Sequence, residues 1–535
     1  MLEGVLWIAL KILLLKPYVP IVSLSVQPPL GLLYLISSLR ERFGKEVEIT
    51  FLDLKSRGLS TQWVRDNLHY YDPDVVGVSV LNCEASTAYE IATICKEYNP
   101  NITTAIGGPY AHRTAENILT DSKFDWVFDG PSERTFTEAI SRLKSGEELG
   151  TDIAGFSYRS NGSLHLNFLN DLSADLDTLP FPAWDLIDFE LYARLPKINS
   201  VMKGRLYAPL FTSRGCPFKC HYCHDIFGKK FISRSAESVL NEIEHLHTTY
   251  GVDEIEVVDD IFNWDRKRVQ TIMGEVSRRW AGKIHFCFPN GLRGDMLDEA
   301  TITALANGGT YSLAIAIEST TPRIQKLIDK NLNAKKAYWA INFADSKGIA
   351  VLGFFMLGFP TETVSEMKDT IDFALKSRLT LAQFFTVIPQ PHTPIYDLAK
   401  SENHEALARF ERRDLAGLGY YSKFSWYGEA YGYPLNRLVV STWIRFYLNP
   451  RRIWKVFTRT PKKSLFFALI RLVQNIASIQ GRIPENPPIL PENRSHGIGK
   501  NLEKRHNDGF QNRSRDSMDF FHQPEARLRK IHKAQ

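Results

Sequence analysis

The chain has 535 residues, too many for a single hydrophobic core, and this length predicts about three folded units. Its hydrophobic content of 44% is ordinary for a globular protein, and six irregularly spaced cysteines exclude a disulfide-rich secreted scaffold. This cysteine usage favours a reducing compartment, so we expect a cytoplasmic protein, and a formal net charge of +5 is too small to indicate a nucleic-acid partner.

The N-terminal segment VLWIALKILLLKP is apolar enough to raise the question of a membrane anchor. Lys11 and Lys16 interrupt it, so no run approaches the roughly 20 apolar residues that span a bilayer. No small-residue cleavage site follows, which argues against a signal peptide. We predict that residues 11–16 form a buried first strand.

Short apolar runs alternate with helical patterns from residue 11 to about 145. The runs are KILLLK, VEITFLDL, DVVGVSV, ITTAIGG and FDWVFDG. Continuous apolar strands that are each followed by a helix indicate a parallel sheet covered on both faces. Residues 1–148 are therefore predicted to form a doubly wound, Rossmann-like α/β domain, and the proline-bearing residues 149–205 an extended linker.

A second series of βα units starts near Tyr207. Its predicted strands are YAPLFTS, DEIEVVDD, KIHFCFP, YSLAIAIES, AVLGFFMLG and LAQFFTV. Six units fall short of the eight that close a full barrel, so we predict a partial (β/α)6 barrel over residues 206–400. Residues 401–485 are expected to form a mostly helical, aromatic C-terminal region, and residues 486–535 a basic, disordered tail.

The loop after the first barrel strand carries Cys216, Cys220 and Cys223 in the spacing CxxxCxxC. Barrels of this kind keep their active sites at the carboxyl ends of the strands. Three thiolates on one short loop can bind a metal or cluster and leave one coordination position open. The alternative is a closed Cys₃His zinc site that uses His221 or His224.

This loop resembles the signature of the radical S-adenosylmethionine (SAM) superfamily, CxxxCxΦC with an aromatic residue at Φ, where Tyr222 stands. The resemblance implies that the three thiolates bind a [4Fe-4S] cluster and that SAM chelates the remaining iron. It implies reductive cleavage of SAM to methionine and a 5′-deoxyadenosyl radical. An external one-electron reductant, such as flavodoxin or ferredoxin, is the partner implied.

Three more segments resemble SAM-binding segments of that superfamily. Asp259 and Asp260 of VVDDIFNWD stand where many members have a GGE motif for the amino group of SAM. Glu318 and Ser319 of AIESTTPRIQKLIDK match the fourth-strand segment, and Gly358 of GFFMLGFPTET lies in the fifth-strand segment near adenine. The alternative for the two aspartates is a solvated strand end whose carboxylates cap the next helix.

Residues at the carboxyl ends of the first sheet resemble the cobalamin-binding domain that precedes the barrel in one radical SAM subfamily. Lys55 replaces the histidine that ligates cobalt in the DxHxxG motif, and a protonated lysine has no lone pair to take its place. The resemblance implies either cobalamin without a histidine ligand or a degenerate domain that has lost the cofactor. The matching residues are Asp53 and Gly58 of DxHxxG, Ser79 and Leu81 of SxL, Gly107 and Gly108 of GG, and Glu133 of GPSE.

The whole pattern is similar to the group that contains the anaerobic Mg-protoporphyrin ester cyclase and the cobalamin-dependent radical SAM methyltransferases. Our leading hypothesis is methylation of an unactivated carbon in a small-molecule or lipid-like substrate. A radical cyclase or ring-rearranging enzyme is the alternative, followed by a cobalamin and cluster sensor and by a zinc-bound structural protein.

The segment 445–476 has helical apolar spacing beside many cations. It is interpreted either as a helical cap on the open barrel or as a peripheral helix at a membrane surface. The second interpretation would favour a lipid or isoprenoid substrate.

Overall fold

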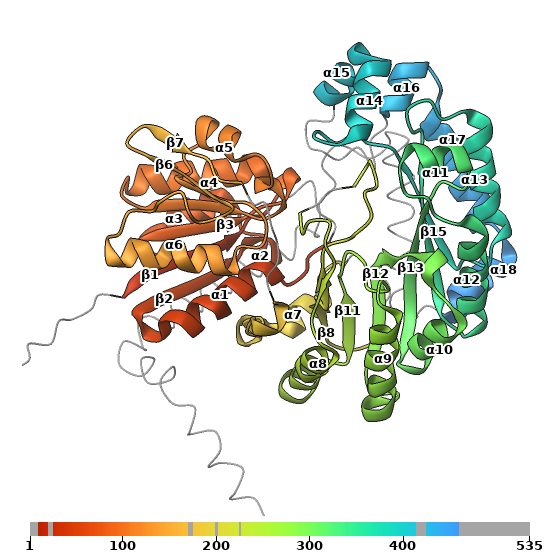
Figure 1. Ribbon diagram of the computed structural model, residues 1–535, viewed down its shortest axis with the longest axis horizontal. Helices are drawn as coiled ribbons and strands as arrows, with labels where there is room; N and C mark the ends of the chain where they lie inside the picture. Colours follow the sequence, from red (N-terminus) through yellow and green to blue (C-terminus); the bar gives the residue numbers. More distant parts are fainter. Residues whose placement is uncertain are drawn as a thin grey trace, which may run out of the picture. The chain divides into compact units, whose positions relative to one another are not determined.

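The computed structural model describes residues 9–19, 25–168, 175–197, 202–223, 226–413 and 424–459. It contains the two predicted sheets, each flanked by helices (Figure 1). The predicted α/β fold class is confirmed, and the strand predicted at residues 11–16 is β1 (Leu10–Lys16).

The first sheet has the strand order β2-β1-β3-β4-β5-β6-β7. Neighbouring strands from β2 to β5 pair in parallel. From β1 the chain adds β2 on one side and β3 to β5 on the other, so the switch point, where such sheets bind ligands, lies between β1 and β3. The further strands are β2 (Val47–Asp53), β3 (Val75–Ser79), β4 (Thr103–Gly107) and β5 (Trp126–Phe128). Its helices are α1 (Leu30–Phe43), α2 (Leu54–Arg57), α3 (Thr61–Tyr71), α4 (Ala85–Tyr98), α5 (Ala115–Asp121) and α6 (Glu133–Ser145).

The sheet continues beyond residue 148, where the sequence predicted a linker. β6 (Phe156–Ser160) pairs antiparallel with β5, and β7 (Ser163–His165) pairs antiparallel with β6. These strands are short and have no helix between them, so they lack the βα rhythm on which the domain boundary was based. The later part of the predicted linker contains α7 (Phe189–Arg194).

The second sheet has six strands in the order β15-β14-β13-β12-β11-β8, and every neighbouring pair is parallel. Within the described residues β8 and β15 do not pair with each other, so the predicted partial barrel is confirmed. The strands are β8 (Tyr207–Leu210), β11 (Glu254–Val257), β12 (His285–Leu292), β13 (Thr310–Glu318), β14 (Ala350–Leu357) and β15 (Leu381–Thr386). The helices between them are α8 (Ala236–Tyr250), α9 (Arg266–Trp280), α10 (Glu299–Asn307), α11 (Pro322–Leu327), α12 (Ala334–Ser346) and α13 (Val364–Lys376).

The C-terminal helices cover one edge of the barrel sheet. The Tyr447 hydroxyl lies 3.1 Å from the amide nitrogen and 2.9 Å from the carbonyl oxygen of Ala382 in the edge strand β15. Both backbone groups of that residue are thereby satisfied at an edge that has no further strand. The helices are α14 (Pro394–Glu402), α15 (His404–Arg413), α16 (Trp426–Tyr431), α17 (Leu435–Tyr447) and α18 (Pro450–Arg459).

Most of residues 460–485 and the tail 486–535 lie outside the described residues, as does the part of the predicted membrane segment after Arg459. Among the helices that the structure describes, none combines the length and apolar character needed to cross a bilayer.

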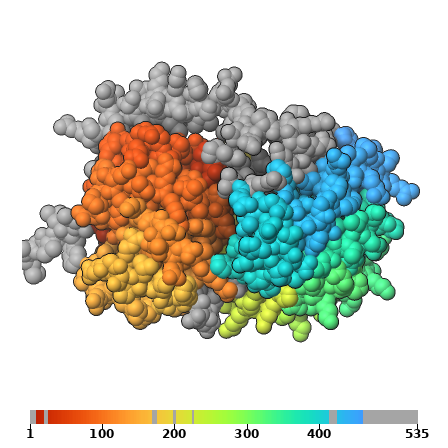
Figure 2. Space-filling view, turned by 90° about the horizontal axis from the view of Figure 1, so that it is seen from above, coloured from red at the N-terminus to blue at the C-terminus, as the bar shows by residue number. Residues whose placement is uncertain are grey.

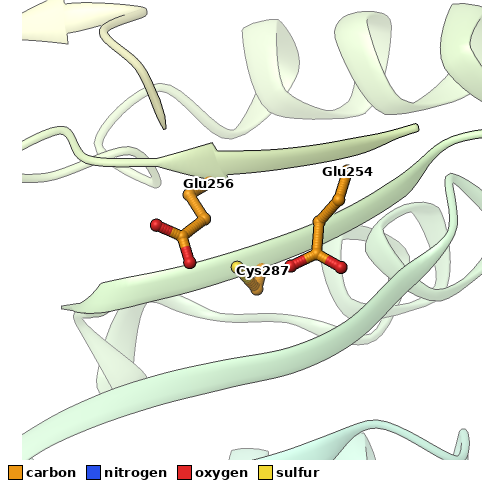
Figure 3. A group of neighbouring side chains, drawn as sticks. All are labelled: Glu254, Glu256 and Cys287. Atoms are coloured by element: carbon orange, nitrogen blue, oxygen red, sulfur yellow. The ribbon is translucent and has the colours of Figure 1, made fainter. Parts of the chain in front are cut away.

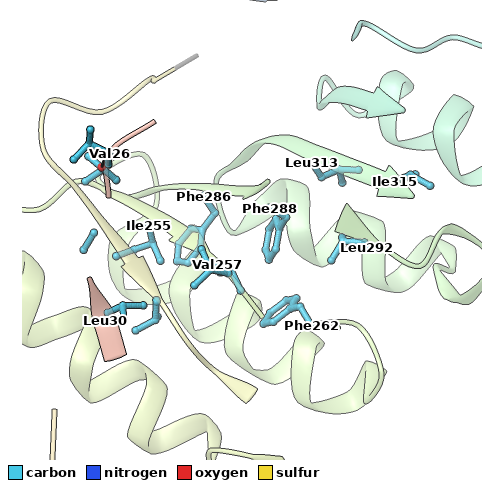
Figure 4. Packing of buried hydrophobic residues seen from close by; sticks show 14 of the residues in the cluster. Val26, Leu30, Ile255, Val257, Phe262, Phe286, Phe288, Leu292, Leu313 and Ile315 are labelled. Carbon is cyan, nitrogen blue, oxygen red and sulfur yellow. Dashed lines mark hydrogen bonds between the residues drawn. The ribbon is translucent and has the colours of Figure 1, made fainter. Parts of the chain in front are cut away.

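The barrel core is apolar over most of its extent. Phe286 and Phe288 of β12 pack in one cluster with Ile255 and Val257 of β11, and Val26 belongs to the same cluster (Figure 4). All five side chains are at most 8% exposed, so contacts between the segment before α1 and the barrel are part of the hydrophobic core.

Three buried polar groups interrupt this core. Glu254 and Glu256 extend from β11 on the same face, and Cys287 of β12 lies between their carboxylates (Figure 3). Glu254 accepts hydrogen bonds from two backbone amides and from the Tyr311 hydroxyl, whereas Glu256 accepts one at 2.8 Å from the Gln27 amide. Burial, reinforced by the Glu254 charge, raises the pKa of Glu256 to about 8. Glu256 therefore carries a proton at neutral pH.

This proton links stability to pH. A carboxyl whose pKa is raised on folding stabilises the protein fully below its unfolded pKa, near 4.5, and loses that contribution as pH rises through the folded pKa of about 8. We expect the free energy of unfolding to fall less steeply with rising pH in Glu256→Gln than in the wild type. The two slopes should differ by up to about 1.4 kcal/mol per pH unit between these limits. Chemical denaturation from pH 5 to about 8 measures the slopes. The control is Glu405→Gln, whose side chain is 89% exposed; an equal change of slope in both variants would contradict the assignment.

Candidate functional site

The three-cysteine loop starts directly after β9 (Ser213–Arg214) and returns through β10 (Ile232–Ser233), which pairs antiparallel with β9. Gly215 adopts a φ of 80°, and a Cβ atom there would lie 2.1 Å from the carbonyl oxygen of Lys230. Only glycine fits this approach of the two loop ends. The sequence places glycine at the one position where the loop must close on itself.

Backbone hydrogen bonds hold the cysteines in a closed turn. The Cys216 amide donates to the Gly228 carbonyl at 3.2 Å, and the Cys223 amide donates to the Cys220 carbonyl at 3.1 Å. All three thiols are outside disulfides; Cys216 and Cys220 are half-buried and Cys223 is exposed. Three unpaired thiols on one closed loop fit the ligand set of a cluster that keeps one iron open.

The Nδ1 atom of His221 is engaged with a backbone carbonyl rather than placed as a zinc ligand. This atom lies 2.8 Å from the Leu327 carbonyl oxygen, and the His221 amide donates to the Ile328 carbonyl at 2.9 Å. The other candidate zinc ligand, His224, lies outside the described residues. The hydrogen bonds of His221 instead attach the loop to the end of α11.

Two predicted SAM contacts, Asp259 and Asp260, support the strand end that carries the loop. Asp259 is buried and accepts hydrogen bonds from the Thr212 amide (2.6 Å), the Thr212 hydroxyl (2.5 Å) and the Ser213 hydroxyl (2.6 Å). Asp260 accepts one from the Gly215 amide at 3.2 Å. Both carboxylates therefore position the loop, and direct contact with SAM stays a prediction.

A buried polar triad lies beside the cysteines. The Lys330 ammonium is 3.2 Å from a carboxylate oxygen of Glu318 and 3.0 Å from the Tyr222 hydroxyl, and that hydroxyl is 3.3 Å from the same oxygen. Glu318 has a φ of 63°, which is unfavourable for a residue with a side chain. Such strain is typical of functional sites, and it occurs here at one predicted SAM-site residue, Glu318. Lys330 was not predicted because nothing in its local sequence separates it from a surface lysine.

The remaining predicted SAM-site residues, Ser319 and Gly358, are also surrounded by protein. The Ser319 hydroxyl is buried within 3.3 Å of the hydroxyls of Thr321 and Thr370. Gly358 has a φ of 87°, and a Cβ atom there would lie 2.5 Å from the Leu435 side chain of α17. Gly358 therefore joins the end of β14 to the C-terminal helices, and its proximity to adenine stays a prediction.

The predicted cobalamin residues gather at one edge of the first sheet. Asp53, Ser79 and Gly107 are the last residues of β2, β3 and β4, and Ser79 is in register with Gly107. Leu81 and Gly108 directly follow two of these strands, and Gly58 ends the short helix α2 after β2. The sequence motifs thus meet at the carboxyl edge, as the fold requires for a ligand site.

Lys55 is held in an ion pair at this edge. Its ammonium lies 3.6 Å from the buried carboxylate of Glu84, and the Lys16 ammonium lies 2.5 Å from the same group. Burial lowers the pKa of Lys55, although the Glu84 charge opposes the shift. Asp53 accepts hydrogen bonds from the Ser56 amide and the Tyr192 hydroxyl. The residues fit cobalamin bound without a histidine ligand, because Lys55 takes the ligand position in the motif and its side chain is engaged with Glu84.

Glu133 connects the first domain to the cysteine loop. Its carboxylate forms a 2.6 Å ion pair with Arg214, two residues before Cys216, and both side chains are 8% exposed. The Arg214 guanidinium also lies over the rings of Tyr34 (5.2 Å) and Phe227 (5.5 Å). The partner of Glu133 was missed because 81 residues separate the two.

Removing one member of this pair leaves a buried charge without compensation, which costs about 3–5 kcal/mol. We expect Arg214→Met to lose stability of that order and Glu133→Gln/Arg214→Met to regain most of it, measured by denaturation of the full chain. The matched control is Arg278→Met, which removes an exposed 2.7 Å pair with Glu275 and is expected to cost less than about 1 kcal/mol. A double variant less stable than Arg214→Met would contradict this account.

Two family models match the chain. The model described as Radical SAM superfamily matches residues 210–374, which include the three cysteines and the triad. The model described as B12 binding domain matches residues 19–140, which include the carboxyl edge of the first sheet.

Curated relatives match both domains. An uncharacterized methyltransferase of Pyrococcus horikoshii is 31% identical over 431 residues, or 80% of this chain and 89% of the relative. Cytidylyl-2-hydroxyethylphosphonate methyltransferase of Streptomyces wedmorensis is 28% identical over 71% of this chain and 79% of its own. The anaerobic magnesium-protoporphyrin IX monomethyl ester cyclase of Rubrivivax gelatinosus is 23% identical over 69% of this chain and 66% of its own length.

Solved structures share the fold. The cobalamin-dependent S-adenosylmethionine radical enzyme OxsB, solved with aqua-cobalamin and S-adenosylmethionine, has a TM-score of 0.62 at 16% identity, over 95% of this chain and 82% of its own. A second structure is the radical S-adenosylmethionine methyltransferase TsrM from Kitasatospora setae, solved with cobalamin and a [4Fe-4S] cluster. It has a TM-score of 0.60 at 18% identity, over 74% of this chain and 75% of its own.

Proposed function

Because the chain belongs to the radical SAM enzymes that carry a B12-binding domain, with SAM, a [4Fe-4S] cluster and cobalamin as cofactors, we propose that it methylates an unactivated carbon of a small molecule. The observation that carries the proposal is the closed loop with three free thiols, tied to the B12-binding domain through Arg214 and Glu133. Methyltransferases among the relatives favour this reaction. An external one-electron reductant, such as flavodoxin or ferredoxin, is part of the proposal.

When bound, the cluster and SAM supply a radical that removes a hydrogen atom, and cobalamin supplies the methyl group. Cys216, Cys220 and Cys223 hold the cluster. Asp259 and Asp260 fix the loop through its backbone, while the triad of Tyr222, Glu318 and Lys330 keeps a charged, buried wall beside it. These residues pre-organise the site before any substrate enters.

The first domain contributes the remaining part of the site. Lys55 and Lys16 share the buried carboxylate of Glu84 at the carboxyl edge, where a cobalt-ligating histidine is absent from the motif. The glycines at the ends of the strands leave room for a bulky ring to approach the backbone. Glu133 acts as the link that fixes this edge relative to the loop.

A radical cyclase is the second candidate, because the Rubrivivax gelatinosus relative is named as a cyclase and matches 69% of this chain. The two reactions differ in the fate of the SAM methyl group. Methylation places this group in the product, whereas cyclisation does not.

The methyl test uses anaerobically reconstituted enzyme, a chemical one-electron reductant, SAM labelled on its methyl group, and polar and lipid fractions of a cell extract. We expect 5′-deoxyadenosine together with label in one small molecule, and loss of both in Cys220→Ala, which removes one cluster ligand. Its folding is checked by circular dichroism. Formation of 5′-deoxyadenosine without transferred label would replace methylation with cyclisation, and absence of both products would reject the radical reaction.

The cobalamin test uses Lys55→His. A neutral imidazole has the lone pair that an ammonium lacks, so we expect it to ligate cobalt in the variant. Electron paramagnetic resonance of bound cob(II)alamin then shows nitrogen splitting from the protein in the variant and none in the wild type. The control is His112→Gln, which leaves the motif intact. Nitrogen splitting in the wild type, or unchanged spectra in Lys55→His, would contradict the assignment of this edge.

A further inference from the structure

Helix α18 (Pro450–Arg459) turns three of its four cations, Arg452, Lys455 and Arg459, toward the protein. The Arg452 guanidinium donates to the carbonyl oxygens of Ala374 (2.9 Å) and Leu375 (2.6 Å) at the end of α13. Lys455 lies 2.8 Å from the fully buried carboxylate of Asp345 in α12, and Arg459 bonds the same group. The polar face of this helix is therefore its docking face.

The apolar side chains of α18 point the other way. Ile453, Trp454 and Phe457 are 52%, 68% and 52% exposed. Two more exposed apolar side chains belong to the end of α17, where Ile444 is 43% and Leu448 68% exposed. We call these five residues the α18 patch; the two helices that carry it lie at the surface, coloured blue in Figure 2. An amphipathic helix of a globular protein normally buries its apolar side, so this arrangement is inverted.

The chain segment that carries the patch has charge of one sign. Arg445 and Arg451 are exposed beside it. Residues 430–484 contain no Asp or Glu, although the whole chain has 60 of them. The cations of this stretch are Arg437, Arg445, Arg451, Arg452, Lys455, Arg459, Lys462, Lys463, Arg471 and Arg482. An apolar surface bordered by cations fits an anionic partner that also accepts apolar side chains.

We propose that the α18 patch docks on the surface of an anionic phospholipid membrane. Tryptophan beside cations is the composition of helices that lie in the headgroup region with their apolar side in the acyl boundary. A second copy of the chain would bring two cationic surfaces together, and residues 460–484 of the same chain carry cations without an acidic residue. Charge complementarity therefore favours lipid over both of these occupants.

Membrane docking would give the enzyme access to substrates that partition into lipid. The inference rests on α17 and α18 and does not depend on methyl transfer. A negative methyl test would not contradict membrane docking, and a negative docking test would not contradict the proposed reaction.

The experiment is flotation of the full-length holoenzyme with two kinds of vesicle, phosphatidylcholine alone and phosphatidylcholine with about 30 mol% phosphatidylglycerol. We expect the protein to float with the anionic vesicles. We expect Trp454→Asp/Phe457→Asp to lose binding by at least about tenfold, because a charge replaces each inserted ring. Arg445→Gln/Arg451→Gln is expected to weaken binding about tenfold or more, since each cation near the surface contributes about 1 kcal/mol.

The matched control is Tyr70→Asp, which changes an aromatic side chain of α3 that is 71% exposed and is expected to leave binding unchanged. Circular dichroism checks that each variant is folded. No flotation of the wild type, or equal loss in Tyr70→Asp, would overturn the proposal. A wild-type dimer that Trp454→Asp/Phe457→Asp converts to a monomer without lipid would assign the patch to self-association instead.

Discussion

The buried ion pair between Arg214 and Glu133 is the constraint on which the site depends. In the proposed function, cofactors held at the two sheets meet over one substrate, and a surface pair would be too weak and too mobile to fix their separation. This pair is buried, lies two residues from the first cysteine, and is packed by aromatic rings. Burial makes each charge intolerant of losing its partner, so this pair attaches the first domain to the start of the cluster loop. The contact of Gln27 with Glu256 joins the same two parts elsewhere.

The cysteine loop is likewise held by groups other than its thiols. In the proposed function its thiols hold iron, so backbone groups and the carboxylates of Asp259 and Asp260 must give the loop its shape. Asp259 uses both oxygens on Thr212 and Ser213, and Gly215 closes the loop where no side chain would fit. The carboxylates that the sequence suggested as SAM contacts are thus engaged in holding the scaffold that presents the cysteines.

The strands and the cysteine loop could be predicted from sequence because their signals are local. Most parallel strands are short, largely apolar runs, and the cysteine spacing lies within eight residues. β6 and β7 could not be found from the βα rhythm, since they are short antiparallel strands. Three contacts could not be predicted because their partners are distant in sequence. Lys330 contacts Glu318 across 12 residues, Arg214 contacts Glu133 across 81, and Tyr192 contacts Asp53 across 139. Local patterns do not encode such pairings.

The C-terminal helices relate the proposed membrane surface to the barrel. Leu435 at the start of α17 packs on Gly358 at the end of β14, and the Tyr427 hydroxyl donates to the Glu362 carbonyl at 2.6 Å. At its other end α17 holds the edge strand through Tyr447 and leads into α18. A force on the α18 patch would therefore act on a helix that contacts the predicted adenine segment. Because α18 is attached through ion pairs to the buried Asp345 rather than through apolar packing, its apolar side is free for lipid without loss of its attachment to the barrel.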